Sequence, residues 1–160
     1  MINLSRRDDL LLKRMAKYPC GDLVSIAKQI KNKKGEYSIN IPHAGVWVVL
    51  ITNKCDYLGY MLPGKIVVKC GDSFLTVLVH EMRHAQQLKI LGNDKFYSYF
   101  HDVDGDRIWN DALEIDAFAA EIANGTGQGS AKPEMKTKWP TNLSKTLRRK
   151  LEQKQATAIR

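Results

Sequence analysis

The segment from Ser73 to Leu91 constrains the fold more than any other part of the chain, because it predicts one long helix with apolar residues on most sides. Its back carries aliphatic residues at helical spacing, among them Leu78, Val79 and Met82. Its front carries two histidines between other apolar positions and is only moderately polar. Such a helix needs an apolar cover for its back and leaves little of its front to solvent. We therefore expect it to lie across the centre of a small domain.

The rest of the chain predicts a few strands before this helix and further helices around it. Residues 37–41 and 46–52 are β-rich and flank the turn 42–45, which predicts a hairpin. A third strand is expected at residues 65–70. Additional helices are expected at residues 4–17, 23–31 and 108–124. The predicted fold class is therefore α+β, with a small, mainly antiparallel sheet packed on the central helix.

Composition divides the chain of 160 residues into a body and a basic tail. Residues 1–124 have the length of one small domain. Residues 125–131 are rich in glycine and predict a flexible linker. Residues 132–160 hold nine lysines and arginines against two glutamates, whereas the preceding 131 residues are nearly balanced in charge. The tail is a candidate for binding nucleic acid or an acidic protein partner, with a solvated tail or an assembly arm as the alternatives.

Several classes of protein are not expected. The longest apolar run, residues 45–52, has the length of a strand and is far short of the ~18 residues of a membrane span. The opening residues lack the continuous apolar core of a signal peptide. The three cysteines are widely spaced and form no Cys-x-x-Cys pair, which argues against a disulfide scaffold. These features predict a cytoplasmic protein that does not enter a membrane.

The central helix contains the motif His80-Glu81-Met82-Arg83-His84, or HExxH. Residues four apart lie on one side of a helix, so His80 and His84 can share one metal ion. Neutral imidazole suits Zn²⁺, and Glu81 is placed to act on a water molecule at that ion. The motif therefore predicts a zinc site with Glu81 as general base.

A third ligand must come from another element, because catalytic zinc commonly takes three protein ligands. Thirty residues after His84 the chain reads Glu114-Ile-Asp-Ala117. HExxH followed at this distance by Glu-x-x-Ala resembles the gluzincin type of zincin metallopeptidases, and most of all the small ImmA/IrrE-like members found in bacteria, phages and mobile elements. The resemblance covers roughly residues 60–124. It implies a minimal zincin-like fold in which Glu114 is the third zinc ligand.

Two other residues compete with Glu114. HExxH followed by sixteen residues and then His101 is similar to the spacing in SprT-like DNA-associated proteases. That alternative would make the basic tail, residues 132–160, a candidate for DNA contact. Glu121 faces the same way as Glu114, because the two are seven residues apart on one predicted helix.

The predicted function is hydrolysis of peptide bonds in a protein or peptide substrate, with Glu81 passing a proton from water to the leaving amine. The strand at residues 65–70 is the expected edge for an extended peptide. Asp116 is a candidate acceptor for the ring N–H of a ligand histidine. Tyr97, Tyr99 and His101 are candidates for stabilising the oxyanion. A zincin fold retained as a regulatory module without activity is the remaining alternative.

Overall fold

The computed structural model describes residues 6–30, 33–54, 58–98 and 112–126. His101, Tyr99 and residues 132–160, which carry predictions from the sequence, lie outside these ranges. The described elements follow one another along the chain as α1 (Arg6–Met15), α2 (Leu23–Ala27), β1 (Gly35–Ile41), β2 (Gly45–Thr52), β3 (Gly59–Leu62), β4 (Lys65–Lys69), α3 (Phe74–Leu91), α4 (Asn93–Ser98) and α5 (Ala112–Ala123). This arrangement confirms the predicted α+β class with a small sheet.

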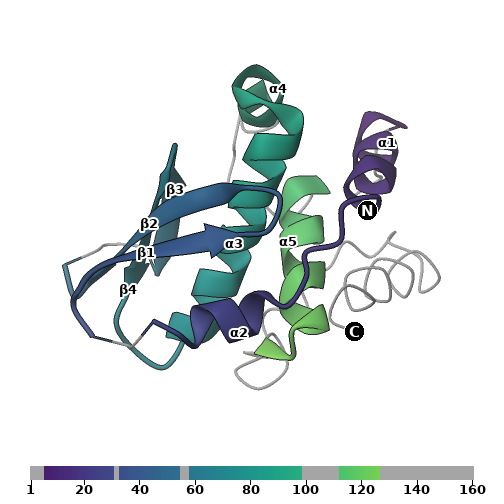
Figure 1. Ribbon diagram of the computed structural model, residues 1–160. Coiled ribbons are helices and arrows are strands. Elements are labelled where there is room, and N and C mark those ends of the chain that lie inside the picture. The colour runs from purple at the N-terminus through teal and green to yellow at the C-terminus, as the bar shows by residue number, and fades with distance from the viewer. Residues whose placement is uncertain (1–5, 31–32, 55–57, 99–111, 127–160) are drawn as a thin grey trace.

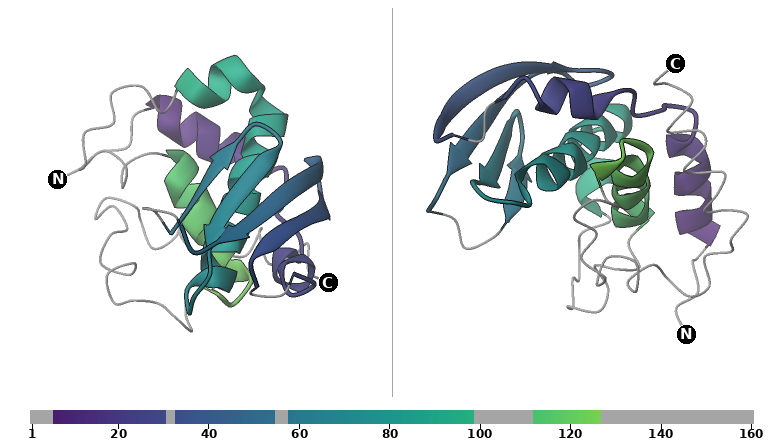
Figure 2. Two further views of the ribbon diagram at one scale, coloured as in Figure 1. Left: turned by 90° about the vertical axis from the view of Figure 1, so that its left-hand side faces the viewer. Right: turned by 90° about the horizontal axis from the view of Figure 1, so that it is seen from below.

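The elements are arranged in layers around α3. Figure 1 shows α3 between the sheet and α5, with α1 on the far side of α5, and the two turned views in Figure 2 show the same order. Both the back and most of the front of α3 are buried, including Leu78, Val79, Met82 and His84. The expectation of a central helix is therefore confirmed.

The sheet has four strands in the order β1-β2-β4-β3. The predicted β1–β2 hairpin is present and antiparallel. The sequence did not predict β3, which forms a second antiparallel hairpin with β4 through a tight turn at Gly64, where the positive φ of 77° suits glycine. That hairpin joins the sheet through β4, so β2 and β4 run parallel, a pairing that was not expected.

This strand order corrects the predicted peptide-binding edge. Residues 65–70 were expected to form that edge, but β4 lies between β2 and β3 and is paired on both sides. Ile66 and Val68 of β4 are buried, as expected of a strand that packs on the core. The two edges are β1 and β3, and β3 packs more extensively against α3 than β1 does.

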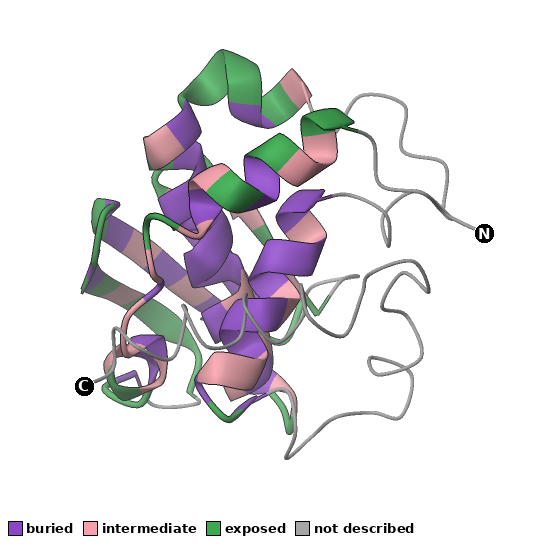
Figure 3. Cartoon of the chain, turned by 90° about the vertical axis from the view of Figure 1, so that its right-hand side faces the viewer, coloured by how far each residue is buried: buried purple, intermediate pink, exposed green. Residues whose placement is uncertain are grey.

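The helix α5 is buried along most of its length, as the burial colours in Figure 3 show. Alanines at positions 117, 119 and 120 have no exposed surface, so α5 can pack closely against its neighbours. Asn124, directly after α5, accepts a hydrogen bond from the Val24 amide through Oδ1 (3.0 Å). Thr126, within the stretch expected to be linker, is buried, and its carbonyl accepts from Oγ1 of Thr76 (3.0 Å). Contact with the core therefore continues to at least residue 126.

None of the helices in the described ranges combines the length and the apolar composition that a membrane span requires. Cys20 and Cys70 are both free thiols. Cys20 is buried and accepts a hydrogen bond from Nδ2 of Asn124 (3.4 Å), and burial raises the pKa of its thiol to about 11.

Candidate metal centre

Three side chains from two helices converge at the interface of α3 and α5. Nε2 of His84 lies 2.6 Å from Oε1 of Glu114, and Nε2 of His80 lies 3.2 Å from Oε2 of the same carboxylate. The two Nε2 atoms are 3.1 Å apart. One ligand atom from each residue lies within 4.8 Å of the others, so His80, His84 and Glu114 form a group that can hold a metal ion. These are the three residues predicted from the two motifs.

The hydrogen bonds of the ring Nδ1 atoms orient both histidines towards this group. Nδ1 of His80 donates to Oε2 of Glu121 (3.1 Å), and Nδ1 of His84 donates to Oε1 of Gln87 (2.7 Å). A neutral ring that carries its proton on Nδ1 has a bare lone pair on Nε2. Both lone pairs therefore point at the Glu114 carboxylate and at each other.

This donor set fits a cation. Two imidazole lone pairs and a carboxylate repel one another at these distances unless positive charge lies between them. Imidazole nitrogen with one carboxylate oxygen is a common ligand set for zinc. The second carboxylate, Glu121, is almost fully buried at its side chain, and its Oε1 has no hydrogen-bond partner among the described residues. The negative charge gathered around His80 is therefore poorly solvated.

The pKa values reflect the same crowding. Burial by itself would lower the pKa of His80, but the charges and hydrogen bonds of Glu114 and Glu121 raise this pKa well above its ordinary value. The pKa of His84 is also raised, because Glu114 outweighs the effect of burial. Burial acts to raise the pKa of Glu114, but the two histidines hold it far below its usual range. Burial raises the pKa of Glu121. With no metal, protons are held between the nitrogens and the carboxylates.

Two members of the group, His84 and Glu114, line a cavity of about 320 Å³. Glu81, next to His80 in the chain, lines the same cavity. Residues 59–61 of β3 and Phe96 and Tyr97 of α4 complete its lining. The proposed base therefore shares one cavity with two of the three candidate ligands, and Tyr97 is the oxyanion candidate that the structure describes there.

A glycine allows the wall to approach Glu81. A Cβ atom built on Gly59 would lie 2.4 Å from Cγ1 of Val77 and 3.2 Å from the carbonyl oxygen of Val67. The same atom would be 3.6 Å from Cγ of Glu81. A larger residue here requires Val77, β3 or α3 to shift, so Gly59 permits the close approach of the edge strand to the proposed base.

The roles of the residues around the ligands differ in part from the predictions. Asp116 was a candidate partner for a ligand histidine, and its carboxylate accepts hydrogen bonds from Arg83 and Gln87. Glu121, a rival for the third ligand, contacts His80 through Nδ1 and so lies behind the ligand group. Gln87 was not predicted, although its position on the histidine face, three residues after His84, is a detectable signal.

The predictions for His101 and Tyr99 concern residues outside the described ranges. The ligand group itself consists of described residues of α3 and α5, with its partners on the same two helices. No family model, no curated protein and no solved structure matches this chain.

Proposed function

We propose that this protein is a zinc-dependent metallopeptidase of the zincin type. The observation that carries the proposal is the shared cavity: Glu81 lines it together with His84 and Glu114, two members of the group that can hold a metal ion. A ligand group alone would be compatible with a structural metal. A carboxylate that lines the same open cavity and is not one of the group supports catalysis.

His80, His84 and Glu114 would hold the ion. The set of two nitrogens and one oxygen suits zinc better than magnesium or calcium, which prefer oxygen ligands. When bound, zinc supplies a Lewis acid that polarises a carbonyl group and lowers the pKa of a coordinated water molecule to about 7.

Glu81 has the position of a general base. It would accept a proton from the attacking water and return this proton to the nitrogen of the leaving amine. Its side chain is largely buried in the wall of the cavity, so few solvent molecules compete with the reacting water. The Tyr97 hydroxyl is the candidate among the described residues for a hydrogen bond to the oxyanion.

The edge strand β3 is the proposed support for a peptide substrate, in place of β4. An edge strand presents unpaired main-chain groups to which an extended peptide can add. Residues 59–61 of β3 also form the wall of the cavity, so a peptide bound there would pass directly over Glu81.

Elemental analysis of purified protein, followed by a peptidase assay, tests the proposal. We expect about one zinc per chain and cleavage of an unfolded protein substrate that stops when a chelator is added. Purified, zinc-supplied protein without bound metal would refute the proposal. Zinc-loaded protein that cleaves no substrate would favour a regulatory zincin-like module.

We propose a separate role for the basic tail, residues 132–160, as a contact for nucleic acid or an acidic protein. The support is its composition, nine basic residues against two acidic ones. A salt titration of DNA binding tests this, comparing the full chain with a chain that ends at residue 131. Binding that weakens steeply with salt and is lost on truncation supports the proposal, and equal binding by both chains contradicts it.

A further inference from the structure

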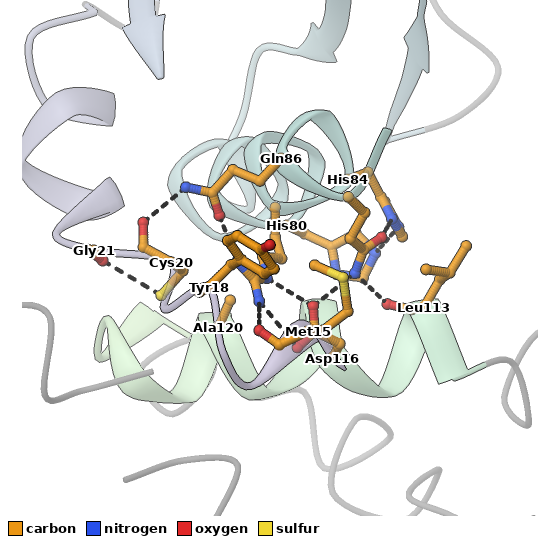
Figure 4. Close-up of polar contacts among 12 residues, drawn as sticks. Met15, Tyr18, Cys20, Gly21, His80, His84, Gln86, Leu113, Asp116 and Ala120 are labelled. Carbon is orange, nitrogen blue, oxygen red and sulfur yellow. Dashed lines mark hydrogen bonds and ion pairs between the residues drawn. The ribbon is translucent and has the colours of Figure 1, made fainter. Parts of the chain in front are cut away.

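Gln87 connects a metal-ligand candidate to the buried polar interior between α3 and α5. Its side chain has no exposed surface. Its Nε2 donates to the carbonyl oxygen of Leu113 (2.9 Å) and to Oδ2 of Asp116 (2.8 Å). Its Oε1 faces Nδ1 of His84 at 2.7 Å. All three contacts join α3 to itself or to α5, and Figure 4 shows His84, Leu113 and Asp116 grouped at this interface.

These contacts determine which way the amide lies. The Leu113 carbonyl and the Asp116 carboxylate accept hydrogen bonds but cannot donate them, so both require the NH₂ end of Gln87. The oxygen end must then face His84, and the short contact requires a proton on Nδ1. A proton on Nδ1 leaves Nε2 as the ring atom with a free lone pair, directed at Glu114. The amide orientation therefore selects the tautomer that can bind a metal.

Asp116 is itself held by Arg83. The Arg83 guanidinium donates to Asp116 through Nε (2.6 Å) and Nη2 (3.3 Å), and neither side chain has exposed surface. The remaining donors of Arg83 reach Oε1 of Gln86 (2.8 Å) and the carbonyl oxygens of Met15 (3.1 Å), the last residue of α1, and Tyr18 (2.8 Å). A buried, fully bonded ion pair of this kind has few alternative arrangements.

We propose that Gln87 is a positioning residue for the metal centre, and that Asp116 and Arg83 hold its amide in the orientation that His84 needs. This inference rests on the proposed metal site and adds a role to residues that do not touch the ion. The two histidines then have orienting partners of different charge. The Glu121 carboxylate orients His80, whereas the neutral Gln87 amide orients His84. Partners of ligand histidines typically change metal affinity about 10–100-fold.

Gln86 provides a matched control. It is also a fully buried amide on α3, and its Nε2 donates to the carbonyl oxygens of Cys20 (2.9 Å) and Pro42 (2.8 Å). Its Oε1 accepts a hydrogen bond from Arg83 (2.8 Å), and none of these three partners is a candidate metal ligand. Changing Gln86 therefore removes a comparable buried amide and one acceptor of Arg83 Nη1, but it leaves the partner of His84 and the bonds of Arg83 Nε and Nη2 to Asp116 in place.

The experiment compares Gln87→Leu and Gln87→Asn with Gln86→Leu and Gln86→Asn in the full chain. Zinc affinity is measured by competition with a chromophoric chelator, and stability of the metal-free chain by urea unfolding. We expect all four variants to unfold at lower urea concentration than the wild-type chain. Only the two Gln87 variants should lose zinc affinity, by about 10–100-fold. The asparagine variants keep an amide one methylene shorter, so they decide the question if the leucine variants do not fold.

A spectroscopic measurement checks directly whether Gln87 fixes the tautomer of His84. In the zinc-loaded wild-type chain, ¹⁵N NMR of the imidazole rings should show a protected Nδ1–H for His84, and this signal should be lost in Gln87→Asn and kept in Gln86→Asn. Equal zinc affinity in the Gln87 and Gln86 variants would overturn this inference alone. A wild-type chain that binds no zinc would instead overturn the proposed metal site, and this inference with it.

Discussion

Nε2 of His80 lies 3.1 Å from Nε2 of His84, while both ring Nδ1 atoms already have acceptors on Glu121 and Gln87. Two nitrogens with lone pairs do not approach this closely without positive charge between them. Shared protons explain the close pair in the metal-free chain, and the proposed metal ion would replace them when it binds.

Glu81→Gln should abolish peptide hydrolysis while zinc remains bound, because Glu81 is the proposed base and is not one of the ligand group. Turnover on an unfolded protein substrate and zinc content are measured on the same preparation. Turnover close to the wild-type value would show that another group accepts the proton. Loss of zinc from the variant would show that Glu81 helps to bind the ion.

Glu114→Ala should weaken zinc binding by several orders of magnitude, since it removes one of the three proposed protein ligands. Glu121→Ala should cost less, about 10–100-fold, because Glu121 acts through Nδ1 of His80. Glu121→Gln is the control, since its amide oxygen can still accept from His80. Competition with a chelator gives all three affinities, and equal losses for the two alanine variants would place Glu121 among the direct ligands.

The stability of the metal-free chain should be greatest between pH 4.5 and pH 6.5, the ordinary pKa values of glutamate and histidine. The raised pKa of His80 gives stability that is present below pH 6.5 and lost as the pH rises through the raised value. The lowered pKa of Glu114 gives stability that is present above pH 4.5 and lost as the pH falls.

Zinc should reverse the alkaline part of this profile, because the ligands must lose protons to bind the ion. Urea unfolding across the pH range, with a chelator and then with zinc, measures both curves. A metal-free chain that becomes more stable as the pH rises from 6.5 would contradict the assignment of shared protons to the ligand group.

Gly59→Ala should destabilise the protein by about 1–3 kcal/mol and reduce turnover, since the added Cβ overlaps Cγ1 of Val77 and displaces β3 from Glu81. The double variant Gly59→Ala/Val77→Ala should recover part of both losses, because it removes the overlapping atom. Urea unfolding and steady-state kinetics give the two quantities. Wild-type stability and turnover in the single variant would show that β3 can shift without consequence.

A chain that ends at residue 131 should keep cooperative unfolding and zinc binding, because residues 125–131 have the composition of a linker and the composition changes abruptly after them. A chain that ends at residue 124 is the matched comparison. It lacks Thr126, whose carbonyl accepts from Thr76 and whose hydroxyl donates to the Glu121 carbonyl (3.1 Å), and should lose about 1–3 kcal/mol. Loss of cooperative unfolding in the 131-residue chain would show that the tail packs on the core.

The positions of the two candidate histidine ligands could be predicted from their spacing in the sequence. His80 and His84 are four apart on a helix that the apolar pattern predicted, and helical geometry places residues four apart on one side. Glu114 was predicted as the third ligand from the resemblance of Glu-x-x-Ala, and it lies against both histidines. The β1–β2 hairpin was likewise a local feature, since its two strands flank a short turn.

The partners of the ligands and the order of the strands depended on tertiary structure. Asp116 and Gln87 each had the chemistry to orient a histidine, and the packing of α5 against α3 decided that Gln87 contacts His84 while Asp116 contacts Arg83. The edge position of β3 depended on which strand of its hairpin joined β2. Spacing within one element is set by backbone geometry, but the rotation and register between elements are set by how all their side chains pack together.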